Sequence, residues 1–219
     1  MSATLPPSDC TEVEIGRTGL AAFLGISDDA RGIVIFAHGS GSGRFSPRNN
    51  YVAQRLRDAG FATLLLDLLS PQEERDRNNV FDISLLASRL RVAADWAADD
   101  SKTGHLQIGY FGASTGAGAA LRAAVGDPRI GAIVSRGGRA DMAGSKALAS
   151  VTAPSLLIVG SLDQAVIELN EVAYDAMHCE REFAIIPGAG HLFEEPGTLD
   201  QVVSLATRWF HTYLGGDRK

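Results

Sequence analysis

Apolar and polar residues alternate along this chain on two length scales, and the alternation predicts an order of strands and helices. Short runs rich in apolar, β-branched and aromatic residues have the length of strands, and most resemble strands that are covered on both faces. These runs occupy residues 32–37, 61–66, 106–111, 130–135, 154–160 and 181–186. Longer segments repeat apolar residues at the spacing of an amphipathic helix. One of them carries Ile83, Leu86, Leu90, Ala93 and Ala97.

Capping residues set the expected helix boundaries. Ser46-Pro47 is typical of a helix start, Gly60 is typical of its end, and Asp82 is placed to cap the long helix after it. We expect a further helix over residues 165–179.

Other local patterns predict the two ends of the chain and one loop. A capping-box pair, Thr198 and Gln201, predicts the start of the last helix. Residues 13–15 and 20–23 predict an antiparallel hairpin. Residues 70–80 are charged and polar, which indicates a surface loop.

Strands alternate with helices along the whole chain, and no segment is repeated. This order predicts an α/β fold with a doubly wound, mostly parallel sheet. We expect one domain over residues 11–219, preceded by a disordered tail at residues 1–10. Sheets of this type bind ligands at the carboxyl ends of their strands, and every loop considered below follows a strand.

Composition narrows the classes of partner. The chain has 219 residues, of which 45% are hydrophobic, and a formal net charge of −6. Its basic residues form no block, so we expect it to bind neither nucleic acid nor an anionic membrane. The first nine residues have no basic or apolar segment, so we expect no signal peptide. The two cysteines, Cys10 and Cys179, form no metal or redox spacing. We expect a cytoplasmic protein without metal or cofactor, and its oligomeric state stays open.

The stretch around Ser114 carries the most informative motif. Gly112-x-Ser114-x-Gly116 has the pattern of a nucleophile elbow, in which a serine stands on a tight bend between a strand and a helix. Small residues are needed two positions before and after it because neighbouring backbone crowds those sites. Gly116 and Gly118 lie within the predicted helix, where glycine costs about 1 kcal/mol relative to alanine. A close approach of helix and sheet would explain that cost.

A serine nucleophile needs a base and an acid, which follow it in the order acid, then histidine, on this type of sheet. His191 lies in a glycine-rich loop after the last predicted strand, where the base belongs. The other four histidines are less suitably placed. Asp163 follows the preceding strand and is the expected acid, although an aspartate there could also cap the next helix. Asp141, after the strand before that one, is the alternative.

A tetrahedral intermediate also needs two hydrogen-bond donors for its oxyanion. We expect these to be the N–H of Thr115, directly after the nucleophile, and the N–H of Ser40 in the loop His38-Gly39-Ser40-Gly41. That loop lacks the Gly-Lys-Ser/Thr ending of a nucleotide P-loop.

Together these motifs resemble the α/β-hydrolase fold, and the short chain is similar to the dienelactone-hydrolase-like branch. The resemblance runs from about residue 32 to residue 214. It implies a serine hydrolase of the carboxylesterase type that cleaves small esters or lactones through an acyl-enzyme. Dienelactone hydrolases proper carry a cysteine at the elbow, whereas this chain has Ser114. There are two alternatives. One is hydrolysis of a dienelactone-like lactone, and the other is a cofactor-free perhydrolase or haloperoxidase reaction that uses the same triad.

Four arginines fall in loops at the catalytic end of the predicted sheet. Arg44, Arg136 and Arg139 are candidate substrate contacts, together with Arg48, since they could attract an anionic substrate group. The alternative is that each pairs with a nearby acid, such as Asp67, Asp141 or Glu194. Residues 136–152 leave no room for a helical cap. We therefore expect an open site that prefers acyl chains of roughly two to six carbons.

Overall fold

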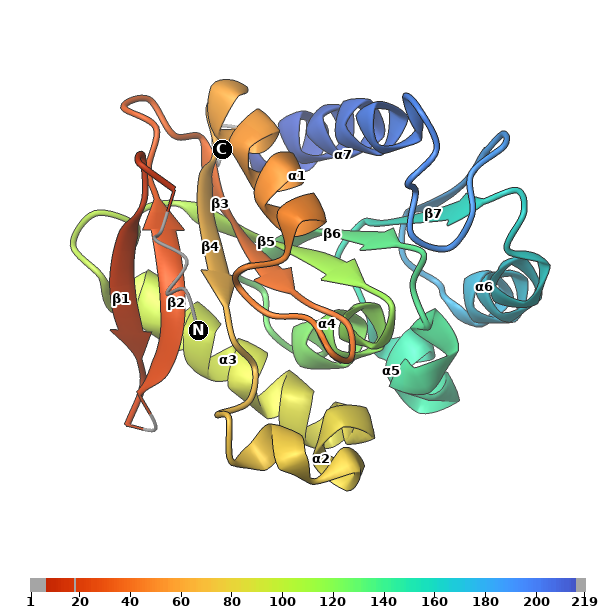
Figure 1. The fold of residues 1–219 in the computed structure, drawn as a ribbon, viewed down its shortest axis with the longest axis horizontal. Helices are drawn as coiled ribbons and strands as arrows, with labels where there is room; N and C mark the ends of the chain where they lie inside the picture. Colours follow the sequence, from red (N-terminus) through yellow and green to blue (C-terminus); the bar gives the residue numbers. More distant parts are fainter. Residues whose placement is uncertain (1–6, 18, 216–219) are drawn as a thin grey trace.

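The computed structural model describes residues 7–17 and 19–215 and shows an eight-stranded sheet between two layers of helices (Figure 1). The strands are β1 (Thr11–Ile15), β2 (Leu20–Gly25), β3 (Gly32–Ala37), β4 (Ala62–Leu66), β5 (Gln107–Ala113), β6 (Ile130–Arg136), β7 (Ser155–Gly160) and β8 (Arg181–Ile186). The α-helices are α1 (Pro47–Asp58), α2 (Arg77–Phe81), α3 (Ile83–Asp99), α4 (Thr115–Ala124), α5 (Ser145–Ser150), α6 (Gln164–Ala176) and α7 (Thr198–Leu214). Two short 3₁₀ turns are η1 (Glu73–Arg75) and η2 (Ala140–Ala143).

The strand order is β1-β2-β4-β3-β5-β6-β7-β8, so β1 and β8 form the edges of the sheet. Strands β3 to β8 pair in parallel, whereas β1 and β2 form the expected antiparallel hairpin and β2 joins β4 antiparallel. The predicted mostly parallel, doubly wound sheet is confirmed. Because the parallel strands all end on the same side, the loops after β3, β4, β5, β6, β7 and β8 gather there.

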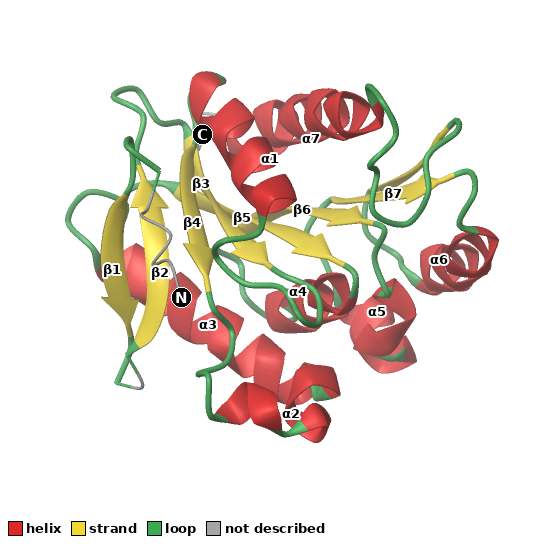
Figure 2. Ribbon diagram, in the orientation of Figure 1, coloured by secondary structure: helices red, strands yellow, loops and turns green. Residues whose placement is uncertain are grey.

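Helices cover both faces of the sheet, as Figure 2 shows. Helices α1 and α7 pack on one face, where Val52, Leu56, Val202 and Phe210 are fully buried against apolar strand residues. Helices α3, α4, α5 and α6 lie on the other face. Apolar strand residues on both faces explain why the central strands read as continuous hydrophobic runs in the sequence.

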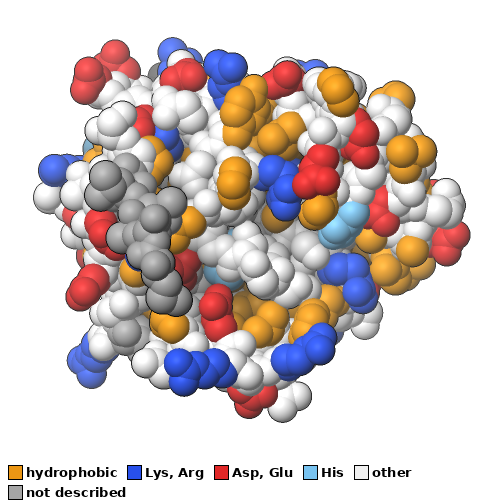
Figure 3. Space-filling view, viewed as in Figure 1, with side chains coloured by type: hydrophobic (Ala, Val, Ile, Leu, Met, Phe, Trp, Pro, Cys, Tyr) orange, Lys and Arg blue, Asp and Glu red, His pale blue; other side chains and the backbone are white. Residues whose placement is uncertain are grey.

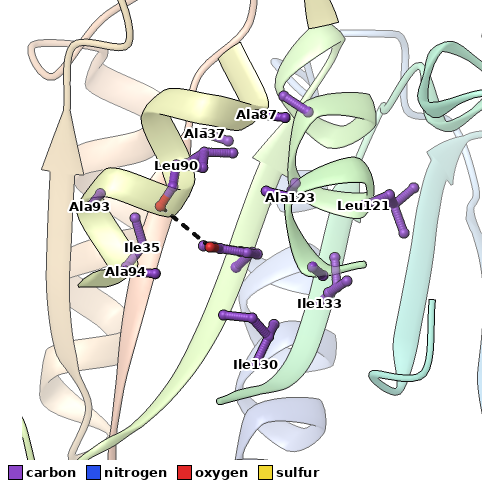
Figure 4. Close-up of a cluster of buried hydrophobic side chains, with 14 of the residues drawn as sticks. Ile35, Ala37, Ala87, Leu90, Ala93, Ala94, Leu121, Ala123, Ile130 and Ile133 are labelled. Carbon is purple, nitrogen blue, oxygen red and sulfur yellow. Dashed lines mark hydrogen bonds between the residues drawn. The ribbon is translucent and has the colours of Figure 1, made fainter. Parts of the chain in front are cut away.

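The larger core cluster lies between α3, α4 and the sheet (Figure 4). Small alanines of both helices face isoleucines of β3 and β6, which allows the helices to approach the sheet closely. Tyr110 is fully buried there and donates a 3.4 Å hydrogen bond to the carbonyl oxygen of Leu90. Burial raises the pKa of the Tyr110 hydroxyl.

Several boundaries differ from expectation. Residues 70–80 are not simply a loop, because η1 and α2 form there; the Asp76 side chain caps α2 by accepting a 2.9 Å hydrogen bond from the N–H of Asn78. Helix α6 ends at Ala176, since Met177 takes an extended conformation and is buried in the core.

The prediction of a capping box at the start of the last helix is wrong. Helix α7 begins at Thr198 itself, and Gly197 precedes it in a left-handed conformation with a φ of 77°. The Thr198 hydroxyl donates a 2.7 Å hydrogen bond to the carbonyl oxygen of Glu195 instead of capping the helix.

The expected tail falls partly outside the described residues, which begin at Pro7. Within the described part, Asp9 forms a salt bridge with Arg57, in which Nε and Oδ2 are 2.7 Å apart. This contact holds the approach to β1 against α1.

Candidate active site

The elbow at Ser114 is built by a close approach of α4 to the sheet. Strand β5 ends at Ala113 and α4 begins at Thr115, so Ser114 alone makes the bend, with φ 50° and ψ −124°. A positive φ is unfavourable for a residue with a side chain. A Cβ at Gly116 would lie 2.1 Å from the carbonyl oxygen of Ala37, which explains why this helical position is glycine.

His191 and Asp163 meet at the ends of two neighbouring strands. Asp163 follows β7 and His191 follows β8, and His191 Nδ1 lies 2.6 Å from Asp163 Oδ2. Asp163 occupies the N-cap position of α6, but its side chain makes no capping hydrogen bond. The carboxylate is therefore committed to the histidine. Asp141, the alternative acid, binds the guanidinium of Arg139 at 2.8 and 2.9 Å.

Ser114 and His191 line the same cavity, which has a volume of about 760 Å³. Such a volume is typical of a site for a small molecule. In the described part of the chain no hydrogen bond joins the serine hydroxyl to the free nitrogen of His191, whose other nitrogen holds Asp163. Contacts between nucleophile and base are often looser than hydrogen-bonding distance before a substrate is bound.

The loop after β3 passes directly over the nucleophile. A Cβ at Gly39 would lie 2.9 Å from the Cβ of Ser114, so only glycine allows this approach. Ser40 lines the cavity and Thr115 is the first residue of α4. Among the described residues, the N–H groups of Ser40 and Thr115 donate no hydrogen bond to another backbone group. Both expected oxyanion donors are therefore uncommitted beside the serine.

His38 has a role that the sequence analysis missed. Its side chain is buried, its Nδ1 lies 2.9 Å from the carbonyl oxygen of Gly39, and its Nε2 lies 3.0 Å from the N–H of Leu68. Since Nε2 faces a donor, it must accept, and Nδ1 carries the proton. The ring thereby fixes the Gly39–Ser40 peptide whose N–H is an expected oxyanion donor. A histidine directly before a glycine-rich loop was the available signal.

Three of the four arginines at this end of the sheet are neutralised by acids. The pairs are Arg44 with Asp67 and Glu12, Arg48 with Glu194, and Arg139 with Asp141. Neither Arg44 nor Arg139 lines the cavity. For these two residues the structure favours the pairing alternative over substrate contact.

Arg136 differs from the other three. It is the last residue of β6, is only 7% exposed, and lines the cavity. Its Nη2 lies 3.5 Å from Asn49 Oδ1, and its guanidinium carbon lies 5.9 Å from the ring centroid of Phe193. Its Nε and Nη1 have no partner among the described residues. Burial, with the nearby charge of Arg48, lowers the pKa of Arg136 to about 10.

The cavity is bounded by loops rather than by a cap domain. Its wall on the α2 side includes Pro71 and Glu74, from the segment expected to be a plain loop. Phe45 and Leu192 add apolar surface and are 41% and 42% exposed. Figure 3 shows that acidic and basic side chains are interspersed over this face, without one large patch of a single sign.

The described residues contain no group of three or more histidine, cysteine or acidic side chains able to hold a metal ion. None of the helices formed by residues 7–17 and 19–215 combines the length and the apolar character needed to cross a bilayer.

A model of the dienelactone hydrolase family matches residues 20–211. Two curated proteins of Mycobacterium tuberculosis strains, each named "putative phosphoribosyl transferase", are 56% identical over 219 residues. The match covers 98% of this chain but 49% of those proteins, so the chain spans about half the length of these relatives.

Solved structures share the architecture. A dienelactone hydrolase from Anabaena variabilis superposes with a TM-score of 0.90 at 52% identity, covering 96% of this chain and 100% of that one. Est1E from Butyrivibrio proteoclasticus has a TM-score of 0.77 at 16% identity, covering 94% and 98%. The second likeness concerns the fold alone.

Proposed function

The chain belongs to the dienelactone hydrolase family and is a hydrolase, and from this premise we propose that it is a serine esterase for small esters or lactones. Ser114 is the nucleophile, His191 the base and Asp163 the acid. The observation that carries the proposal is the 2.6 Å contact between His191 Nδ1 and Asp163 Oδ2, in a pair that opens on the same cavity as Ser114.

Acylation follows from this arrangement. The Ser114 oxygen attacks the carbonyl carbon while its proton passes to Nε2 of His191, whose Nδ1–H is held by Asp163. The carbonyl oxygen becomes an oxyanion that accepts hydrogen bonds from the N–H groups of Ser40 and Thr115. Loss of one such donor typically costs about 2.7–4 kcal/mol in the transition state. The imidazolium then returns the proton to the leaving alcohol.

Deacylation reverses these roles. His191 takes a proton from water, the resulting hydroxide attacks the acyl carbon, and the proton returns to the Ser114 oxygen as the acid leaves. No oxidant, reductant or cofactor is required for either half of the reaction. Since the elbow residue is a serine, we place general esters before dienelactones as substrates.

The "putative phosphoribosyl transferase" name of the curated relatives belongs to proteins about twice as long as the matched segment. We propose that the segment shared with this chain contributes hydrolysis. We also propose a preference for acyl chains of roughly two to six carbons, because the site lacks a cap domain that would cover a long chain.

Covalent labelling tests the nucleophile. A fluorophosphonate should add one equivalent to the wild-type protein, detected by intact mass, and none to Ser114→Ala. Ser40→Ala is the matched control, since it removes another hydroxyl from the cavity but keeps the backbone N–H. It should label normally.

Hydrolysis of p-nitrophenyl esters of increasing chain length, together with simple lactones, tests the reaction class. Ser114→Ala should lose hydrolysis of every one of them. Hydrolysis by Ser114→Ala at the wild-type rate would remove this residue from the mechanism. Rates that keep rising to long-chain emulsified esters would refute the chain-length preference.

A further inference from the structure

Arg136 carries a buried positive charge that no acid of the described chain balances. The other three arginines at this end of the sheet each contact at least one carboxylate within 3.1 Å. Among the described residues, the polar contact of the Arg136 guanidinium is the 3.5 Å one to the Asn49 amide oxygen, beside the face of Phe193 at 5.9 Å, and two of its nitrogens have no hydrogen-bond partner. Burying a charge without a partner is unfavourable, which calls for a reason beyond folding.

The charge lies next to the reacting serine. Ala113 of β5 pairs with Arg136 of β6, and the N–H of Ser114 donates a 3.4 Å hydrogen bond to the carbonyl oxygen of Arg136. Arg136 and Ser114 also line the same cavity. A group bound at the guanidinium would therefore be held within one small molecule's length of the ester bond.

A helix end adds to the positive potential. Helix α1 has 12 residues and begins with Pro47, Arg48 and Asn49, all of which line the cavity. The N-terminus of a helix carries a partial positive charge and favours anions. In this first turn Pro47 has no N–H and the N–H of Asn49 donates to Ser46 Oγ at 3.4 Å, so the N–H of Arg48 is the one without a partner among the described residues. The Asn49 side chain is buried between this helix end and Arg136. Two independent sources of positive potential thus converge on one side of the cavity.

The acids that line the cavity do not cancel this potential. Asp67 is already bound by Arg44, through both its side chain and its backbone N–H. Glu74 lies in η1, on the α2 side of the sheet, whereas α1 lies on the opposite side (Figure 1). Arg48 is held by Glu194, so within residues 7–17 and 19–215 Arg136 is the arginine on the α1 side of the cavity that no acid balances.

We propose that Arg136 and the first turn of α1 form an anion subsite, and that the natural substrate is an ester carrying a carboxylate or a phosphate beside the bond that is cut. The subsite rests on the proposed esterase function. A guanidinium matches both oxyanions in geometry, and its bonds to them are charge-assisted. The anion orients the ester carbonyl toward Ser114.

The test compares three acetate esters that differ in one group. Phenyl acetate is neutral, 4-acetoxybenzoate carries a carboxylate, and 4-acetoxyphenyl phosphate carries a phosphate. For each ester, kcat/KM is compared between wild type and Arg136→Met, so differences in leaving-group reactivity between the esters cancel in the ratio. The loss for an anionic ester should be about ten- to a hundredfold greater than for phenyl acetate, as for a hydrogen bond to a charged group. Monoethyl and diethyl glutarate repeat the comparison with the charge on the acyl side.

The matched control is Arg139→Met, which removes a paired arginine that lies outside the cavity. It should affect neutral and anionic esters equally.

A second readout is the melting temperature. Arg136→Met should melt at or above the wild-type temperature, since it removes an unbalanced charge. A purely structural arginine would give a lower one.

The outcomes separate the two proposals. If the wild type cleaves none of the esters, the esterase function fails. If it cleaves them but Arg136→Met weakens neutral and anionic esters equally, the subsite is refuted. If the variant does not fold, inhibition of wild-type phenyl acetate hydrolysis decides, and failure of both benzoate and phenyl phosphate to compete would refute the subsite. A selective loss for one of the two anions identifies the substrate class.

Discussion

Replacing Asp163 by asparagine tests whether this carboxylate holds His191 in the tautomer that can accept the serine proton. Asp163 Oδ2 lies 2.6 Å from His191 Nδ1, and the carboxylate side chain is 16% exposed. Asparagine has nearly the same shape but no charge. Its amide can donate to Nδ1, which moves the imidazole proton to Nε2, and a protonated Nε2 cannot accept the serine proton.

The expected magnitude follows from this change of tautomer. Loss of the orienting carboxylate in a serine triad lowers kcat by about 10⁴, which corresponds to ~5 kcal/mol at 1.36 kcal/mol for each factor of ten. The fold should survive, because the Asp163 side chain makes no capping bond to α6 and its backbone N–H still donates to Gly160.

Asp141→Asn is the matched control. It removes an acid of the same kind after the preceding strand, and in the described part of the chain the salt bridge with Arg139 is the one side-chain contact that it breaks. A partly exposed pair of this kind is worth about 0–1 kcal/mol, so kcat should stay near the wild-type value. Stopped-flow or steady-state hydrolysis of p-nitrophenyl acetate supplies kcat, and circular dichroism confirms the fold. The reasoning is refuted if folded Asp163→Asn keeps its rate or if Asp141→Asn is the variant that loses it.

Two further substitutions address the backbone around the serine. His38→Phe should lower kcat and destabilise the fold by about 1–3 kcal/mol, because it leaves the N–H of Leu68 buried without an acceptor. His38→Asn can keep a donor near the Nδ1 position and should lose less activity. If the two variants lost equal stability in urea unfolding and equal kcat, this role of His38 would be contradicted. Gly116→Ala should reduce the yield of folded protein or lower its melting temperature by several degrees, because its Cβ would meet the carbonyl oxygen of Ala37 at 2.1 Å; wild-type stability in a thermal scan would show that the helix can move away.

The sequence predicted the sheet well because burial on both faces imposes a strong local signal. Each central strand is an apolar run with turn residues at its end, so the succession of strands along the chain and the loops that follow them could be inferred without long-range information. The order of the strands within the sheet was not predicted. The helical character of residues 73–81 was missed because those residues are exposed and polar, and their caps depend on local hydrogen bonds. The start of α7 was misplaced because Gly197, rather than a side chain, makes the turn.

In the candidate site, too, the features with a local sequence signal could be predicted, and those that depend on long-range contacts could not. The positions of Ser114, Asp163 and His191 follow from chain order on this type of sheet, and a local motif marks the serine. Which arginines are neutralised could not be deduced, because Arg48 and its acid are 146 residues apart in sequence. That Arg136 has no acidic partner among the residues that the structure describes is a property of the assembled fold, and the local sequence does not indicate it.

The position of β8 at the edge of the sheet has a consequence for how activity is lost. Strand β8 pairs only with β7 in the described part of the chain, its first four residues are half-buried, and Ile185 is 47% exposed. Regions with few buried contacts open locally at a lower free energy than the whole domain. His191 follows this strand by five residues, whereas Ser114 follows a central strand. Fraying of the edge would therefore withdraw the proposed base, His191, while the proposed nucleophile, Ser114, stays in place. We expect heat to abolish hydrolysis before it melts the core.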